Sequence, residues 1–135
     1  MAKEFKLAVV APDRTVFEDM VVSVIAPGEL GYLGALAGHE DSIIALKTGI
    51  VEYSDATNQR YHVSISGGFM EMSSEGAIIL ADTAELSSEI DIERAEKALD
   101  EARKALRGEV SGVTTQQATA ELERAMNRVK AAKRN

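Results

Sequence analysis

The amino-acid pattern changes at residues 90–95, IDIERA, and this change constrains the fold more than any other feature of the chain. Before it, short β-branched and apolar runs are separated by glycine turns; after it come alanine, charged residues and a helical apolar period. Asp91 can cap a helix, because its carboxylate can accept hydrogen bonds from backbone N–H groups of the first turn. The sequence therefore predicts a β domain over residues 1–86 and a two-helix hairpin over residues 87–135.

The first part has the pattern of a small all-β domain. Short strand-forming runs follow one another with no helical segment between them, which favours an antiparallel sandwich or barrel. Four glycines within residues 28–39 predict tight corners there rather than a regular strand. Phe69 and Met72 are expected to pack inward. Separate short strands are predicted over residues 42–46, 49–54, 60–66, 69–72 and 77–81.

The second part carries two helical apolar stripes, with members three and four residues apart: Ile92, Ala95, Leu99, Ala102 and Leu106, then Ala118, Leu122, Ala125, Val129 and Ala132. Gly108 and Gly112 bracket the break, and Thr114 with Gln117 has the capping-box pattern. The short connection predicts antiparallel neighbours. Because the seam is rich in alanine, it buries little apolar area. The hairpin must therefore lean on the β domain, a partner or a ligand, and it can open.

Charge is divided unevenly between the two parts. Residues 1–88 carry five Lys and Arg against thirteen Asp and Glu, a net of −8, whereas residues 89–135 have a net of +1. An acidic body repels phosphates, which argues against a nucleic-acid partner. No apolar run reaches the ~20 residues of a membrane span and no signal-peptide pattern is present, so we expect a soluble protein without direct membrane insertion. The absence of cysteine fits a reducing compartment.

The sequence contains no arrangement typical of a catalytic or metal site. His39 and His62 are the two histidines, and neither has a second ligand at metal spacing. Residues 66–68, SGG, lack the lysine and the following helix of a phosphate loop. No serine–histidine–acid set is present. We therefore expect no catalytic residues, no required cofactor and no independent enzyme.

Three arginines form a candidate anion site. Arg124 and Arg128 share one helical face, and a hairpin closing near residue 111 places Arg94 opposite Arg128. Like charges on facing layers repel unless an anion lies between them, and Asp91, Glu85 or a bound phosphate could be that anion. A solvated ion-pair cluster explains the same residues, and from the residues alone it is the favoured explanation.

Four segments in the same order and spacing resemble the epsilon subunit of bacterial F-type ATP synthase: residues 28–39, 66–72, 90–95 and 124–128. The resemblance implies an N-terminal β-sandwich of about ten antiparallel strands followed by a C-terminal helical hairpin. It also implies a non-catalytic rotor subunit in the central stalk of a proton-translocating synthase. Such a subunit binds the gamma subunit and rests on the c ring, at the cytoplasmic face of the bacterial inner membrane. Its hairpin can extend to the alpha/beta head and inhibit ATP hydrolysis.

The resemblance also assigns roles to individual residues. Glu29 and His39 would contact the c ring, although Ala37 and Asp41 stand where the family usually has proline. Some members bind ATP as a regulatory ligand on the folded hairpin, and the role of magnesium is left open. The matching residues in this chain are Glu85, Asp91, Arg94, Arg124 and Arg128. Glu101 stands where strong ATP binders have an arginine, which reverses a charge.

Two other functions fit the residues. One is a stand-alone nucleotide-sensing module, and the other is a structural interaction protein that binds through an edge of its sandwich. Co-purification separates them from the rotor subunit, because only the rotor subunit should be isolated together with gamma and the c ring.

Overall fold

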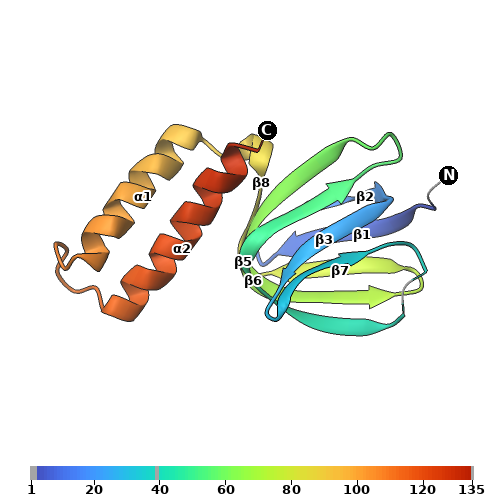
Figure 1. Cartoon of the computed structure of the whole chain (residues 1–135), viewed down its shortest axis with the longest axis horizontal. Helices are drawn as coiled ribbons and strands as arrows, with labels where there is room; N and C mark the ends of the chain where they lie inside the picture. Colours follow the sequence, from blue (N-terminus) through green and yellow to red (C-terminus); the bar gives the residue numbers. More distant parts are fainter. Residues whose placement is uncertain (1–2, 39, 135) are drawn as a thin grey trace.

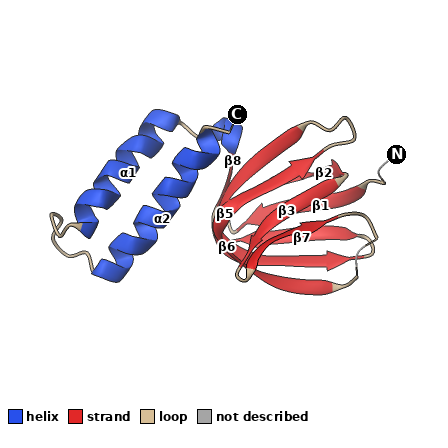
Figure 2. Cartoon of the chain, viewed as in Figure 1, coloured by secondary structure: helices blue, strands red, loops and turns tan. Residues whose placement is uncertain are grey.

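The computed structural model describes residues 3–38 and 40–134. The described chain forms eight strands followed by a pair of helices, which lie side by side at one end of the strands (Figures 1 and 2). The strands are β1 (Phe5–Ala11), β2 (Arg14–Val21), β3 (Ser23–Gly28), β4 (Gly31–Ala35), β5 (Ser42–Ser54), β6 (Arg60–Ser73), β7 (Gly76–Ala81) and β8 (Ala84–Leu86). A 3-10 turn, η1 (Ser87–Glu89), leads to α1 (Ile92–Leu106) and α2 (Thr115–Ala132). The predicted fold class, a β-sandwich followed by a helical hairpin, is confirmed.

Strand pairing is antiparallel throughout the described sheet except at one place. The order is β2-β1-β7-β6-β5-β3-β4, with β8 paired to β6 outside this path. β1 and β7 pair in parallel, with Leu7 opposite Ala77 and Val9 opposite Ile79. Parallel neighbours need a long crossover connection, and here the intervening strands supply it. This pair is the exception to the predicted antiparallel arrangement.

The two longest strands, β5 and β6, contain 13 and 14 residues and pair along almost their whole length. The first half of β6 pairs with β8, and the second half pairs with β7. Each long strand therefore contributes to both layers, and the predicted separate strands within it are continuous. Counted as two segments each, β5 and β6 account for the difference between eight observed strands and about ten predicted. Gly68 permits this continuity: its φ is 132°, and a Cβ there would collide with the carbonyl oxygen of Leu80.

The glycine-rich stretch contains a regular strand, so the prediction of unpaired corners over residues 28–39 was wrong for β4. β3 and β4 pair antiparallel from Val24–Ala35 to Gly28–Gly31, which leaves Glu29 and Leu30 as a two-residue turn. Gly31 has a φ of 134°, a conformation that glycine adopts easily next to a tight hairpin turn. The glycines thus serve the turn and the edge strand together.

The sandwich core consists of large apolar side chains from the inner faces of the strands. Its fully buried members are Leu7, Val9, Val21, Val24, Val51, Val63, Ile65, Met70 and Ile79. The prediction that Phe69 packs inward was wrong, because its side chain is 56% exposed and Met70 takes the inner position. The prediction for Met72 was correct.

Both predicted helix caps are confirmed. The Asp91 carboxylate accepts from the backbone N–H groups of Glu93 and Arg94, at 3.1 and 3.3 Å. Thr114 and Gln117 form a reciprocal capping box at the start of α2. The hairpin meets the sandwich through α2, which packs against β5 and β6. A small apolar cluster lies at this junction, formed by Ile50, Ile90, Ala95, Val129 and Ala131.

Candidate functional site

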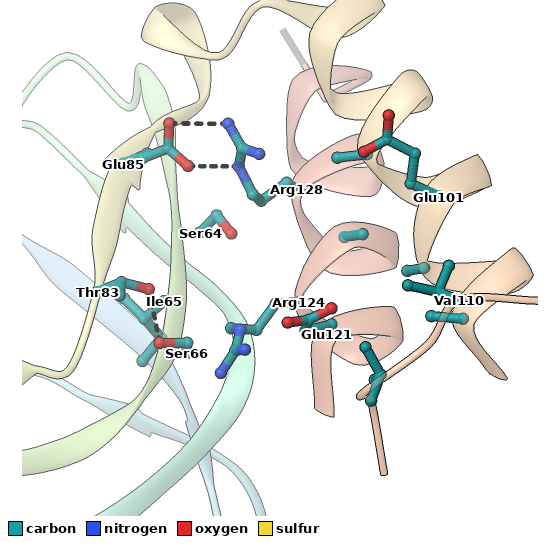
Figure 3. A pocket seen from close by; sticks show the side chains of 15 residues that line it. Ser64, Ile65, Ser66, Thr83, Glu85, Glu101, Val110, Glu121, Arg124 and Arg128 are labelled. Atoms are coloured by element: carbon teal, nitrogen blue, oxygen red, sulfur yellow. Dashed lines mark hydrogen bonds and ion pairs between the residues drawn. The ribbon is translucent and has the colours of Figure 1, made fainter. Parts of the chain in front are cut away.

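A cavity of about 570 Å³ lies between the hairpin and the strands β6 and β8. This volume falls within the ~300–1,000 Å³ typical of small-molecule pockets. The helices present short apolar side chains, the strands present hydroxyl groups, and five charged residues complete the lining (Figure 3). The lining residues are Ser64, Ile65, Ser66, Thr83, Glu85, Ala98, Glu101, Ala102, Ala105, Val110, Val113, Glu121, Arg124, Ala125 and Arg128.

The cavity exists because alanine occupies half of the helix positions that line it, and every apolar one among them. Ala102 and Ala125 are buried, yet their side chains end at Cβ and cannot fill the gap. Larger apolar residues at such positions would close it, as they do in ordinary helix pairs. The alanine-rich seam predicted from the sequence is therefore also the apolar wall of the cavity.

Arg128 is held by a carboxylate within the cavity lining. Its Nε donates to Glu85 Oε1 at 2.6 Å, and its Nη2 donates to Glu85 Oε2 at 3.3 Å (Figure 3). Two parallel hydrogen bonds from one guanidinium are the stronger form of an arginine–carboxylate pair. Both side chains are about one-third exposed, at 33% and 34%, so water screens the pair. In this structure Glu85 therefore supplies the anion that the sequence required near Arg128.

Arg124 lies one helical turn earlier and is differently placed. Figure 3 shows its guanidinium extending from α2 toward Ser66 of β6 and toward Thr83, which lies between β7 and β8. Those two hydroxyls share a hydrogen bond of 2.6 Å. Within residues 3–38 and 40–134, no side chain forms an ion pair or hydrogen bond with this guanidinium. An unpaired guanidinium beside two hydroxyls can bind a phosphate or a carboxylate.

The other two predicted ATP-site residues lie outside the cavity lining. Asp91 is engaged as the cap of α1, and Arg94 is exposed in the first turn of that helix. The structure thus brings together Glu85, Arg124 and Arg128 but does not add Asp91 and Arg94 to them.

Sequence reasoning missed several lining residues. Ser66 and Thr83 gave no signal because their proximity depends on β8, a three-residue strand that no pattern predicts. Glu121 was also missed, and with Glu85 and Glu101 it brings three carboxylates to a cavity that holds two arginines. The spacing of Glu121 and Arg124 on one helix could have placed both on the same face.

The residues predicted to contact the c ring belong to a different part of the chain from the cavity. Glu29 is exposed in the β3–β4 turn, where its backbone N–H donates to the Ala45 carbonyl at 3.0 Å. Leu30, next to it, is fully exposed. His39 lies outside the described residues. Both assignments stay predictions.

A histidine–glutamate pair lies on the long strands β5 and β6. His62 Nε2 lies 3.0 Å from Glu52 Oε1 on neighbouring strands. Among the described residues, no three His, Cys, Asp or Glu side chains are grouped to hold a metal ion. Likewise, neither described helix is both long enough and apolar enough to cross a membrane.

Comparison with known proteins gives consistent matches along the chain. Residues 4–87 match the family model of the ATP synthase delta/epsilon chain beta-sandwich domain, and residues 88–133 match that of its long alpha-helix domain. The ATP synthase epsilon chain of Moorella thermoacetica is 43% identical over 126 residues, 93% of this chain and 94% of that one. The epsilon chain of Desulforamulus reducens is 39% identical over 132 residues, 98% and 99% of the two chains.

A solved structure agrees with these sequence matches. A chain in the cryo-EM structure of Euglena gracilis mitochondrial ATP synthase, comprising OSCP, F1 and the c ring, superposes with a TM-score of 0.80 at 28% identity. The match covers 96% of this chain and 81% of that chain.

Proposed function

The chain belongs to the delta/epsilon chain family of ATP synthase subunits, and from this premise we propose that it is a non-catalytic rotor subunit of the central stalk. In this role it binds the gamma subunit and the c ring, and through them it couples proton flow to the alpha/beta catalytic head. Its place is the cytoplasmic face of the bacterial inner membrane, where it is held by these partners. The observation that carries the proposal is that both modules match the family, in order and over nearly the whole chain.

The exposed β3–β4 turn supports the ring contact. It projects Glu29 and Leu30 from the edge of the sheet, and its hydrogen bond to β5 fixes its direction. A cysteine in place of Glu29 or His39 should crosslink to the polar loop of the c subunit. Efficient crosslinking to alpha or beta instead would mean that the turn faces the other way.

The hairpin supports a regulatory role. In the docked form seen here it forms one wall of the cavity, and its buried residues are mostly alanine, so docking is only marginally favoured. Extended into one rod, residues 91–135 would span roughly 68 Å at about 1.5 Å per residue, long enough to reach the catalytic head. We assign inhibition of ATP hydrolysis to the extended form and ATP binding to the docked form.

ATP is the proposed ligand of the cavity. Arg124 is free to receive a phosphate, and Arg128 can exchange Glu85 for one. Because Glu101 and Glu121 oppose the charge of ATP, binding should be weak, and Glu101 replaces the arginine of strong binders. A ligand at a hundredfold excess over its Kd stabilises the docked form by about 2.7 kcal/mol, which moves a nearly balanced equilibrium decisively.

Calorimetric titration of the full chain with ATP, with and without magnesium, tests the sensing role. We expect saturable binding that needs near-millimolar ATP and that Arg124→Ala abolishes. Lys97→Ala is the matched control, because this exposed charge on α1 does not line the cavity. The absence of binding at physiological ATP would remove the sensing role and leave the rotor role standing.

Co-purification tests the rotor role independently. The tagged chain should be isolated with gamma and the c ring from membranes. Recovery of the chain alone would favour the stand-alone nucleotide-sensing module or the structural interaction protein.

A further inference from the structure

One polar side chain joins the helical hairpin to the long strands. Asn127 of α2 donates through Nδ2 to the Gly49 carbonyl at 2.7 Å and to Ser64 Oγ at 2.9 Å, and it lies 3.5 Å from the Ile65 carbonyl. These acceptors belong to adjacent positions of the β5–β6 ladder, where Gly49 pairs with Ile65 and Ile50 with Ser64. We call the hydrogen bonds of Asn127 with Gly49, Ser64 and Ile65 the Asn127 contact.

The surroundings of the Asn127 contact make it sensitive to loss. Ser64 is only 6% exposed, and Ile50 and Val129 of the junction cluster lie close to Gly49 and Asn127 in sequence and are buried. Water reaches such acceptors poorly, so a docked hairpin without the amide donor leaves them unsatisfied. An undocked hairpin exposes the same groups to water. The hydrogen bonds therefore favour the docked form specifically.

The strand segment that receives Asn127 also contacts β3 and β4. A Cβ on Gly49 would collide with the Pro27 ring and lie 2.8 Å from the Tyr32 hydroxyl, so β3 and β4 approach β5 closely at this point. The Tyr32 hydroxyl accepts from the Ile50 backbone N–H at 3.1 Å. Tyr32 belongs to β4, two residues beyond Leu30 of the turn.

We propose that the Asn127 contact is the positional lock of the docked hairpin, and that Tyr32 holds the strand segment in the position that receives it. This inference rests on the hairpin opening described under the proposed function, but it concerns α2 and β5 rather than the cavity. The ATP-binding proposal and the Asn127 proposal can therefore be disproved independently. Titration with ATP tests binding in the cavity, whereas Asn127 variants measured without ATP test the lock.

The test uses the full chain, which has no cysteine of its own. Cysteines replace Glu75 on the sandwich and Glu123 on α2, both exposed, and carry a pair of dyes whose energy transfer reports the separation of the two parts. Asn127→Asp preserves the shape but turns a carboxylate toward two carbonyl oxygens. At neutral pH we expect roughly a tenfold or larger shift toward the open form, since a buried unsatisfied polar group costs ~1–3 kcal/mol and a tenfold change is ~1.4 kcal/mol.

Lowering the pH distinguishes two reasons for an open hairpin in the Asn127→Asp variant: repulsion between the new carboxylate and the carbonyl oxygens, and misfolding. Docking raises the pKa of the introduced carboxyl, because its charged form faces carbonyl oxygens. The docked form then binds the extra proton, so closure should return as pH falls and be lost as pH rises. Other charged or ionisable side chains lie on α2 itself (Arg128), on β8 (Glu85), on β5 (Glu52) and on β6 (His62), so the pH profile of the unsubstituted chain, which contains all four, is recorded in parallel.

Met126→Ala is the matched control, because this neighbouring side chain is 52% exposed. It should leave the open fraction unchanged, while Tyr32→Phe should shift it in the same direction as Asn127→Asp but less. An Asn127→Asp chain with the energy transfer of the unsubstituted chain at neutral pH would overturn the lock. An unchanged Tyr32→Phe chain would overturn the role of Tyr32.

Discussion

The sandwich and the hairpin are both folded, but they are held by interactions of different size. The sandwich buries large β-branched and long apolar side chains between layers whose strands pair across the whole domain. In the hairpin, the buried residues of α1 are Ala95, Ala102 and Ala105, and α2 adds Val129 to three more alanines. Since burial free energy scales with apolar area, the sandwich is a stable platform and the docked hairpin is a weakly held arm. Under the proposed function, this difference would let the hairpin change position while the sandwich keeps its shape.

Core truncation should show the largest difference between the two parts. Leu7→Ala in the sandwich should lower the free energy of unfolding by about 2–5 kcal/mol, because a fully buried leucine leaves a cavity that the sheet cannot close. Leu99→Ala in the partly buried hairpin seam should cost about 1 kcal/mol or less. Urea denaturation of the two variants measures both values. Equal losses would contradict the comparison.

Alkaline pH should destabilise the sandwich through Tyr53. Burial raises the pKa of Tyr53 to about 12 from 10.0, with smaller contributions from Tyr61 and Asp19. A raised pKa means that the folded state retains the proton, so this stabilisation is complete below pH 10 and is lost as pH rises toward 12. Tyr53→Phe keeps the ring packed on Phe17, whose centroid lies 4.2 Å away, and should reduce the alkaline loss. The measurement is the urea denaturation midpoint of the unsubstituted chain and of Tyr53→Phe as pH rises from 10 toward 12. If both midpoints fall equally, Tyr53 is not responsible for the loss of stability.

The Arg128–Glu85 pair should contribute modestly to docking and little to the sandwich. Glu85→Gln keeps the shape and removes the charge, and we expect a loss of about 1 kcal/mol or less in docking, since water reaches both side chains. Glu101→Gln is the comparison, because this cavity carboxylate forms no ion pair within the described residues. It should leave docking unchanged and tighten ATP binding. Energy transfer between the dyes at positions 75 and 123 measures the docked fraction. If Glu101→Gln opened the hairpin more than Glu85→Gln does, Glu101 and not Glu85 would be the carboxylate that supports docking.

Removal of the hairpin should have the smallest effect on the sandwich. A chain ending at Leu86 retains every strand of the described sheet, so it should keep its β circular dichroism spectrum and bind gamma. We expect its unfolding free energy to change by less than about 1 kcal/mol, because the junction cluster is small. An unfolded spectrum would show that the two-module division is wrong.

Local patterns in the sequence predicted much of this molecule. Asp91 and Thr114 gave correct helix starts because a cap is decided within four residues, and the apolar periods gave the hairpin. The strand β4 was missed because glycine is a poor local strand former, and only its pairing with β3 reveals the strand. β5 and β6 were predicted in pieces because their continuity depends on both layers at once. Ser66 and Thr83 meet only through the β6–β8 pairing, which no local pattern contains.

The burial of Ser87 is another feature that local sequence patterns do not predict. In the sequence Ser87 stands between Leu86 and Ser88, and no local pattern marks it as buried. The structure buries it to 2% exposure, and within the described part of the chain its hydroxyl has no hydrogen-bond partner. Ser87→Ala should favour docking slightly, because an unpaired buried hydroxyl costs free energy that an opened hairpin recovers in water.

Under the proposed rotor role, the continuity of β5 and β6 has a mechanical consequence. Force applied at the β3–β4 turn enters β5 through the Glu29–Ala45 hydrogen bond and the Tyr32–Ile50 hydrogen bond. Because β5 and β6 share one uninterrupted ribbon across both layers, many backbone hydrogen bonds carry a shearing force together instead of breaking in turn. The sandwich should therefore deform little under torque, and compliance should be concentrated beyond Leu86, where the weakly held helices begin.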